Sequence, residues 1–306
     1  MIVRQTGNGN YLVTIAIGVS YFESWNNVSL PSWIRYAEKY DLGIIVITAD
    51  LLERHNQFWK KPTWQKMLIP KYIFEQKVEC NFVCYIDSDV IINPFAPNIF
   101  DLAIHNKIGV VSVRHNMPFD FYEVNRRLAY LRRTYIEFDF SLTSAQHFST
   151  KELYDYHGFP DQKDEFCAGV LLFSPKYFAE ILESWFYLYR ADVKSITNGG
   201  EQTHLNYHVL SSKVANFLPY KFQTIWSFEI AWSHFRLFEE RFENEESLSE
   251  VLNQVLLNSY FLHFAGNQAE TMSAFVKGVI DIDSFIEKWN DLDKYNYLKF
   301  IPKALS

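Results

Sequence analysis

Two aspartates, Asp87 and Asp89, directly follow an apolar run in the stretch "NFVCYIDSDVIINPF" (81–95). Residues i and i+2 of an extended segment point the same way, so both carboxylates can face one point in space. Two such charges repel each other unless a cation lies between them or one takes a proton. Hard oxygen ligands favour Mg²⁺, Mn²⁺ or Ca²⁺ over zinc. The pair is therefore a candidate metal site, although Asp-x-Asp alone also occurs in surface turns.

The composition is that of a globular protein of enzyme size. The chain has 306 residues, 48% hydrophobic and 21% charged, enough for one large domain or two modest ones. A net charge of −7 argues against a nucleic-acid partner, which a basic patch would attract. Three cysteines without framework spacing predict reduced thiols and a cytoplasmic location. No stretch approaches the roughly 18 apolar residues of a transmembrane segment, so none is expected.

Strand-like and helical patterns alternate along the first third of the chain. Strands are expected over 11–18, 43–48, 82–86 and 108–113. Helices are expected over 32–40 and 63–77. This alternation predicts an α/β fold with a mostly parallel sheet that helices cover on both faces. Ligands of such sheets bind beyond the carboxyl ends of the strands, which is where Asp87 and Asp89 stand.

The sheet pattern is interrupted by a long excursion, 117–165, and returns afterwards. An excursion of this length usually has a function, as a lid or a binding insertion. A further strand is expected over 166–175 and a late strand over 260–266. Between them, residues 199–212 are expected to form a loop that leads into a helix. No linker of low complexity separates the parts, so a single domain is predicted.

Five stretches together resemble the GT-A-fold glycosyltransferases, which use nucleotide-sugar donors. The stretch around Asp87 resembles their Asp-x-Asp strand. Four others resemble the retaining glycogenin-like and galactosyl- and xylosyltransferase group: "WQKMLIPKYI" (64–73), "FCAGVLLFSP" (166–175), "EQTHLN" (201–206) and "LHFAG" (262–266). The resemblance implies a Rossmann-like mixed, mostly parallel sheet flanked by helices in one GT-A domain over 1–306. Its parts would be a nucleotide-sugar-binding half (11–113), an acceptor-side insertion (117–165), an acceptor and metal-histidine half (166–266) and a C-terminal helical tail (267–306).

The resemblance also implies ligands for a cofactor and a donor. Mn²⁺ (or Mg²⁺) would be bound by Asp87, Asp89 and His263, although a buried histidine explains His263 when it is taken alone. The donor, a UDP-sugar, would contact Ile17, Gly18, Ser20, Tyr21, Lys66, Ser88, Cys167, Ala168 and Gly266. Two positions depart from the family pattern. Cys167 replaces an asparagine whose amide would bind the sugar, and Ala269 replaces a lysine that would bind phosphate.

Two pairs of residues compete for the catalytic role. Glu201 and Gln202 stand where retaining members place groups near the anomeric carbon, as a nucleophile or as stabilisers of the transition state. A carboxylate at the start of a helix explains Glu201 nearly as well, because the helix dipole favours it there. Asp164 and Glu165 are the alternatives, one of which an inverting enzyme would use as general base. Sequence spacing leaves both mechanisms open.

The expected function is transfer of a UDP-hexose or UDP-pentose sugar to a glycan, a lipid-linked molecule or another hydroxyl acceptor in polysaccharide biosynthesis. A nucleotide-sugar-binding protein of the same fold without turnover is the alternative. Lysines and aromatic residues mix in 294–305, which leaves weak peripheral membrane contact open, although a packed segment is favoured. Neither the acceptor nor the oligomeric state is indicated.

Overall fold

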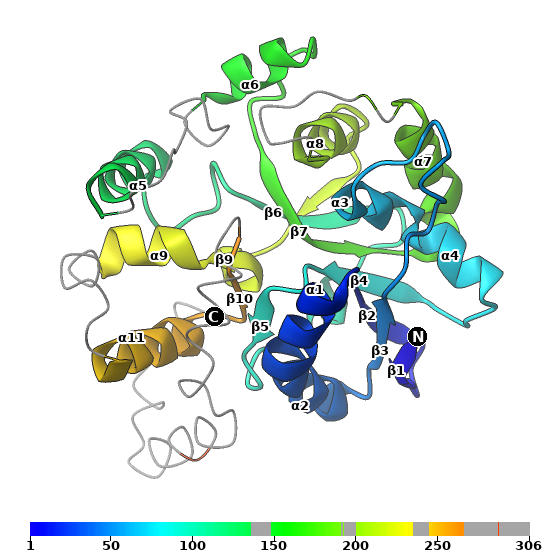
Figure 1. The fold of residues 1–306 in the computed structure, drawn as a ribbon, viewed down its shortest axis with the longest axis horizontal. Coiled ribbons are helices and arrows are strands. Elements are labelled where there is room, and N and C mark those ends of the chain that lie inside the picture. Colours follow the sequence, from blue (N-terminus) through cyan, green and yellow to red (C-terminus); the bar gives the residue numbers. More distant parts are fainter. Residues whose placement is uncertain (136–147, 191, 193–199, 235–244, 266–286, 288–306) are drawn as a thin grey trace.

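The fold is built on a seven-stranded sheet with helices on both faces (Figure 1). The structure is a computed structural model that describes residues 1–135, 148–190, 192, 200–234, 245–265 and 287. Across the sheet the strands follow in the order β1 (Ile2–Arg4), β3 (Gly43–Ile47), β2 (Asn10–Ile15), β4 (Phe82–Ile86), β7 (Phe166–Phe173), β6 (Ile108–Ser112) and β8 (Ala215–Phe217).

Parallel and antiparallel pairings are equally frequent in this sheet. β2 runs parallel to β3 and β4, and β6 runs parallel to β8. β7 is antiparallel to both β4 and β6, and β1 is antiparallel to β3. The predicted α/β class and the mixed sheet flanked by helices are confirmed, while parallel pairing does not dominate as expected. Insertion of β7 between two strands of the opposite direction brings its first residues to the carboxyl end of β4.

Helices pack on the two faces of the sheet, α2 (Leu30–Tyr40) on one face and α3 (Pro62–Gln65), α4 (Ile69–Glu75), α7 (Pro175–Tyr187) and α8 (Gln202–Ser211) on the other. The other described helices are α1 (Val19–Ser24), α5 (Phe121–Tyr135), α6 (Thr150–Tyr156), α9 (Trp226–Ser233) and α11 (Glu245–Asn258). Val13 packs into one core with Phe178 and Leu205, and its neighbour Leu12 packs into the other core with Trp33. Because both faces are buried, the strands read as continuous apolar runs.

The helix expected over 63–77 is divided into three parts. A turn of 3-10 helix, η2 (Lys66–Leu68), separates α3 from α4. Pro70 has no amide hydrogen to donate to the carbonyl of Lys66, so a continuous α-helix cannot form there. The interruption therefore falls at Lys66, one of the predicted donor residues. Other short helices are η1 (Trp25–Ser29, a π-helix), η3 (Ile99–Leu102) and η5 (Tyr220–Gln223).

A second, three-stranded sheet decides how the site is assembled. Its order is β5 (Val90–Ile92), β10 (Phe261–His263) and β9 (Thr224–Ile225). β10 is antiparallel to β5, with His263 opposite Val90, and parallel to β9. The late strand predicted over 260–266 is thus found, and it lies beside the residues that follow Asp89.

Several boundaries differ from the expected ones, and some predictions lie outside the described residues. The strand expected over 166–175 ends at Phe173, because Pro175 begins α7. The excursion 117–165 contains α5 and α6, and its residues 136–147 are outside the described part. Gly266 also lies outside the described part. The same holds for the predicted C-terminal tail 267–306, apart from residue 287, and for the membrane contact considered for it. None of the described helices combines the length and the apolar character that a membrane crossing requires.

Candidate metal and donor site

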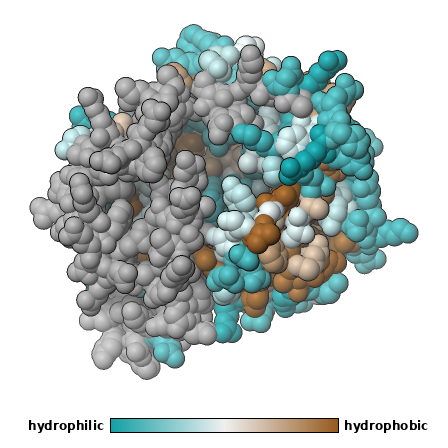
Figure 2. Space-filling view, viewed as in Figure 1, coloured by the Kyte–Doolittle hydropathy of each residue, from teal (hydrophilic) through white to brown (hydrophobic). Residues whose placement is uncertain are grey.

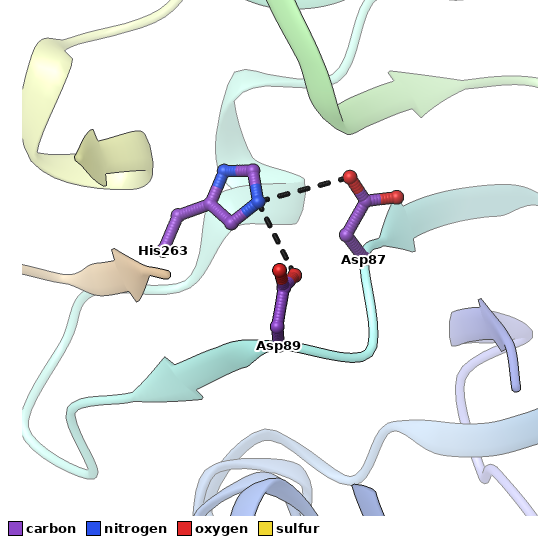
Figure 3. Close-up of side chains that lie close together, drawn as sticks. All are labelled: Asp87, Asp89 and His263. Carbon is purple, nitrogen blue, oxygen red and sulfur yellow. Dashed lines mark ion pairs between the residues drawn. The ribbon is translucent and has the colours of Figure 1, made fainter. Parts of the chain in front are cut away.

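Asp87, Asp89 and His263 meet at the junction of the two sheets (Figure 3). Both aspartates lie in the loop between β4 and β5, and the pairing of β10 with β5 brings His263 to this loop. The Nε2 atom of His263 is 3.2 Å from Asp89 Oδ1 and 3.7 Å from Asp87 Oδ2. One ligand atom from each residue lies within 4.8 Å of the others. The three predicted metal ligands are therefore brought together.

The backbone around these aspartates is held from three sides. The amide of Asp87 donates to the carbonyl of Gly169 in β7 (2.9 Å), and the amide of Phe264 donates to the carbonyl of Asp89 (3.0 Å). The hydroxyl of Ser29 donates to the carbonyl of Ser88 (2.8 Å). Because hydrogen bonds fix the loop, the two carboxylates are presented by a defined backbone and not by a free surface turn.

The charges of this group are not balanced by hydrogen bonds alone. Asp89 Oδ1 is buried and receives no hydrogen bond in good geometry from the described residues. Burial by itself would lower the pKa of His263, but the charge of Asp89 raises it well above the usual value. Asp89 thus favours a positive charge at this place, which a divalent cation would also supply. Two carboxylate oxygens and one imidazole nitrogen suit Mn²⁺, so these residues fit the implied metal.

Gln223, which the sequence analysis did not single out, orients the imidazole of His263. In the amide orientation that satisfies its neighbours, its oxygen accepts from His263 Nδ1 (3.2 Å) and from the amide of Gly169 (3.1 Å). This bond places the Nδ1 proton away from the aspartates and leaves Nε2 facing them. Gly169 is required beside the ring, because an added Cβ would lie 2.4 Å from His263 Cε1.

Lys66 is a buried lysine that links the metal group to α8. Its side chain is 2% exposed, and Nζ lies 2.7 Å from Glu201 Oε1 and 3.4 Å from Asp87 Oδ1. Nζ also donates to the carbonyl of Ala168 (2.9 Å). Burial by itself would lower the pKa of Lys66, but the carboxylates of Asp87 and Glu201 raise it above its usual value. The ammonium group is therefore charged, and a surface lysine is excluded.

The remaining candidate catalytic residues are held in a neighbouring network. Glu165 forms a buried ion pair with Arg114, whose Nε donates to Oε2 (3.0 Å), and Gln202 Nε2 donates to Oε1 (2.7 Å). Asp164 Oδ1 accepts from the hydroxyl of Ser112 (2.6 Å) and from the amide of Glu165 (2.7 Å). Arg114 was missed by the sequence analysis, although it follows β6 at the sheet edge where ligands bind.

The other predicted donor residues divide into two groups. Cys167 and Ala168 are buried in β7, and Cys167 Sγ lies 3.7 Å from His263 Nδ1. Ile17, Gly18, Ser20 and Tyr21 follow β2 at the same sheet edge, with Tyr21 61% exposed. In the view of Figure 2 the described surface is mostly hydrophilic, and its exposed apolar residues gather near the centre. Among the described residues, no hydrogen bond or ion pair joins this loop to the metal group.

No protein-family model and no curated protein sequence matches the chain. Solved structures do. A glycosyltransferase involved in glycosylation of the major capsid of PBCV-1 is 11% identical, with a TM-score of 0.48 over 87% of this chain and 98% of that one. The bifunctional glycosyltransferase WbbM is 12% identical, with a TM-score of 0.49 over 93% of this chain, which spans 52% of WbbM. The galactosyltransferase LgtC is 14% identical, with a TM-score of 0.44 over 89% of this chain and 97% of that one.

These similarities carry no weight for the reaction, because the identities are at most 14% and every TM-score is below 0.5. The chemistry has to follow from the site itself. All three solved structures are glycosyltransferases, the class that the sequence motifs of this chain resemble.

Proposed function

We propose that this protein is a metal-dependent glycosyltransferase that moves a sugar from a nucleoside diphosphate donor, a UDP-sugar, to a hydroxyl of a glycan or a lipid-linked acceptor. One observation carries the proposal. The Asp87–Asp89–His263 group is joined through the buried ammonium of Lys66 to Glu201 at the start of α8. A cation site with free coordination positions, next to a fixed positive charge and a carboxylate, suits transfer away from a diphosphate.

Asp87, Asp89 and His263 would hold a divalent cation, Mn²⁺ or Mg²⁺. When bound, the cation supplies a positive charge that stabilises the departing diphosphate. Lys66 would add a second charge to the same leaving group, since its carboxylate partners keep it protonated. Gln223 holds Nε2 of His263 toward the two aspartates, and Gly169 lets the ring approach β7.

Retention is the stereochemical course that the side chains favour. An inverting enzyme needs a carboxylate with a free oxygen to take the proton of the acceptor hydroxyl. Both oxygens of Glu165 are occupied by Arg114 and Gln202, whereas Asp164 accepts both of its hydrogen bonds, from Ser112 and from a backbone amide, through Oδ1, so Oδ2 of Asp164 is the one inverting candidate left. Glu201 pairs with Lys66, which also contacts Asp87 of the metal group, and Gln202 follows it. These contacts support Glu201 and Gln202 as the groups nearest the reacting carbon.

The place of the reaction is part of the proposal. All three cysteines, Cys80, Cys84 and Cys167, are free, which supports a reducing compartment such as the cytoplasm. A step of polysaccharide biosynthesis would use both a nucleotide-sugar and a glycan acceptor there.

The test is release of UDP from a panel of UDP-sugars, with Mn²⁺, with Mg²⁺ and with EDTA. The proposal predicts metal-dependent release from at least one donor, and NMR of the transferred sugar would give the configuration of the new bond. Donor binding without any release, across all donors and acceptors, would instead support a binding protein without turnover. A product of inverted configuration would rule out the roles given to Glu201 and Gln202.

A further inference from the structure

An open pocket lies beside α8, and no residue assigned above to the metal, the donor or the reaction lines it. Its volume is about 630 Å³. Three segments form it: the end of α6 with the residues that follow, the chain after α7, and the first turns of α8. The residues that give it its chemical character are Tyr156, His157, Phe159, Tyr189, Arg190 and His204.

Two histidines line this pocket, and each has a buried ring nitrogen without a hydrogen-bond partner among the described residues. His204 is only 5% exposed, and its Nδ1 atom has no hydrogen-bond partner among the described residues. His157 lies against it with a ring distance of 4.9 Å, and its Nε2 atom also lacks a partner there. Burial lowers the pKa of both rings, that of His204 to about 3. Both are therefore neutral at pH 7, and each ring carries one donor and one acceptor nitrogen.

Aromatic rings form the rest of the wall. Phe159 stacks on Tyr207, with ring centroids 4.3 Å apart and planes inclined by 4°. Tyr189 meets the ring of His204 edge-on at 4.4 Å, and Tyr156 is 58% exposed at the rim. Flat apolar surfaces with a few fixed polar groups are typical of pockets that bind small molecules in a set orientation.

These groups select a neutral, hydroxyl-bearing ligand. A sugar ring presents an apolar C–H face to an aromatic side chain, and its hydroxyls can donate to or accept from a neutral imidazole in either tautomer. A phosphate group would need cations, but the histidines are neutral and the charges of Arg190 and Asp192 oppose each other. A metal ion would need a third ligand, and the group at Asp87 is the only such set among the described residues.

The pocket shares a wall with the proposed reaction site. His204 follows Glu201 by three residues, about 4.5 Å along the axis of α8. Trp64 packs on His204 (5.0 Å) and on Tyr189 (5.7 Å), and Lys66, two residues further, contacts Glu201. We propose that this pocket is a carbohydrate subsite, which holds one sugar ring of a glycan acceptor beside the reacting groups. Its role as an acceptor subsite rests on the proposed function, whereas its affinity for a sugar does not.

The experiment separates these two statements. Free saccharides (glucose, galactose, xylose and their short oligomers) are titrated against the full-length protein in EDTA, followed by saturation-transfer NMR. We expect at least one saccharide to bind without metal or donor. Tyr156→Ala and His157→Ala should each weaken that binding about tenfold, as loss of one aromatic or polar contact would. Tyr122→Ala removes a 66% exposed tyrosine of α5 and serves as the matched control, with affinity equal to the wild type.

Absence of saccharide binding to the wild-type protein, or equal binding by the two pocket variants with unchanged melting temperatures, would overturn the inference. UDP release by the wild type is measured in parallel. If UDP is released but the saccharide affinity does not depend on Tyr156 or His157, only the subsite is wrong. If no UDP-sugar is consumed but the variants lose saccharide binding, the carbohydrate site stands and the proposed function fails.

Discussion

Two carboxylate groups lie at the same edge of the main sheet, the half-buried pair Asp87 and Asp89 and the buried Glu165, and different partners balance their charges. In the metal group, Asp87 pairs with Lys66 and His263, whereas Asp89 faces Nε2 of His263, and its Oδ1 receives no hydrogen bond in good geometry from the described residues. Glu165, in contrast, has one oxygen bound by Arg114 and the other by Gln202. A charge cluster that lacks some of its hydrogen-bond or charge partners (incompletely matched) indicates a place for a ligand. A cluster in which every carboxylate oxygen has a partner (fully matched) indicates a structural role.

The largest effect should come from the incompletely matched group. Asp89→Asn removes one ligand charge without changing the size of the side chain. We expect metal-dependent release of UDP to fall about a thousandfold or more, because the charge on the diphosphate is no longer stabilised. Steady-state rates and Mn²⁺ titration followed by electron paramagnetic resonance would check this result. Asp101→Asn, at an exposed position, is the control. Unchanged Mn²⁺ affinity in the Asp89 variant would contradict the assignment.

Substitution of Glu165, whose charge is balanced by Arg114, should change the stability of the protein. Glu165→Gln leaves the guanidinium of Arg114 buried without its countercharge, which should lower the free energy of unfolding by about 3–5 kcal/mol. Urea denaturation measures this quantity. The double variant Arg114→Met with Glu165→Leu removes both charges and should recover part of the loss. A stable Glu165→Gln protein without activity would reverse the comparison and favour an inverting mechanism with Glu165 as base.

A smaller effect is expected at Gln223, which orients the histidine of the metal group. Gln223→Leu removes the acceptor of His263 Nδ1, so Nε2 is no longer held toward the aspartates. Mn²⁺ affinity should fall about tenfold to a hundredfold, as for other residues that orient metal ligands. Gln223→Glu keeps an acceptor oxygen and should lose less. Equal Mn²⁺ affinity in the Leu variant, again by titration, would show that the tautomer is fixed in another way.

The smallest effect concerns His204, which is buried and neutral and has no countercharge among the residues that the structure describes. Burial lowers its pKa from 6.5 to about 3, with a smaller contribution from His157. Between these values the unfolded chain binds more protons than the folded one, so stability is present above pH 6.5 and is lost as the pH falls. From about pH 7.5 to about pH 5.5 the wild type should lose about 1 kcal/mol more than His204→Phe. Thermal or urea unfolding at both pH values would check this, and equal losses would contradict it.

Much of the site could be predicted from local patterns, because those patterns have a direct geometric meaning. Asp87 and Asp89 follow a buried strand, so their position at the ligand-binding edge follows from the apolar run. Glu201 stands just before α8, as its sequence context indicated. Gln223 and Arg114 could not be predicted, since nothing near them in the sequence indicates which buried group each contacts. Local patterns could not predict that β7 is antiparallel to its neighbours either, because an apolar strand has the same sequence pattern in either direction.

The sequence alone determined that two carboxylates share one direction and that the apolar runs must form a sheet covered on both faces, since side-chain alternation and burial are local properties. The tertiary structure decided the rest. Pairing of β10 with β5 brings His263 to the aspartates. The helix break before Pro70 falls at Lys66, which is buried between Asp87 and Glu201. Such contacts join residues far apart in the chain. Their geometry depends on strand pairing and packing, which no short stretch of sequence contains.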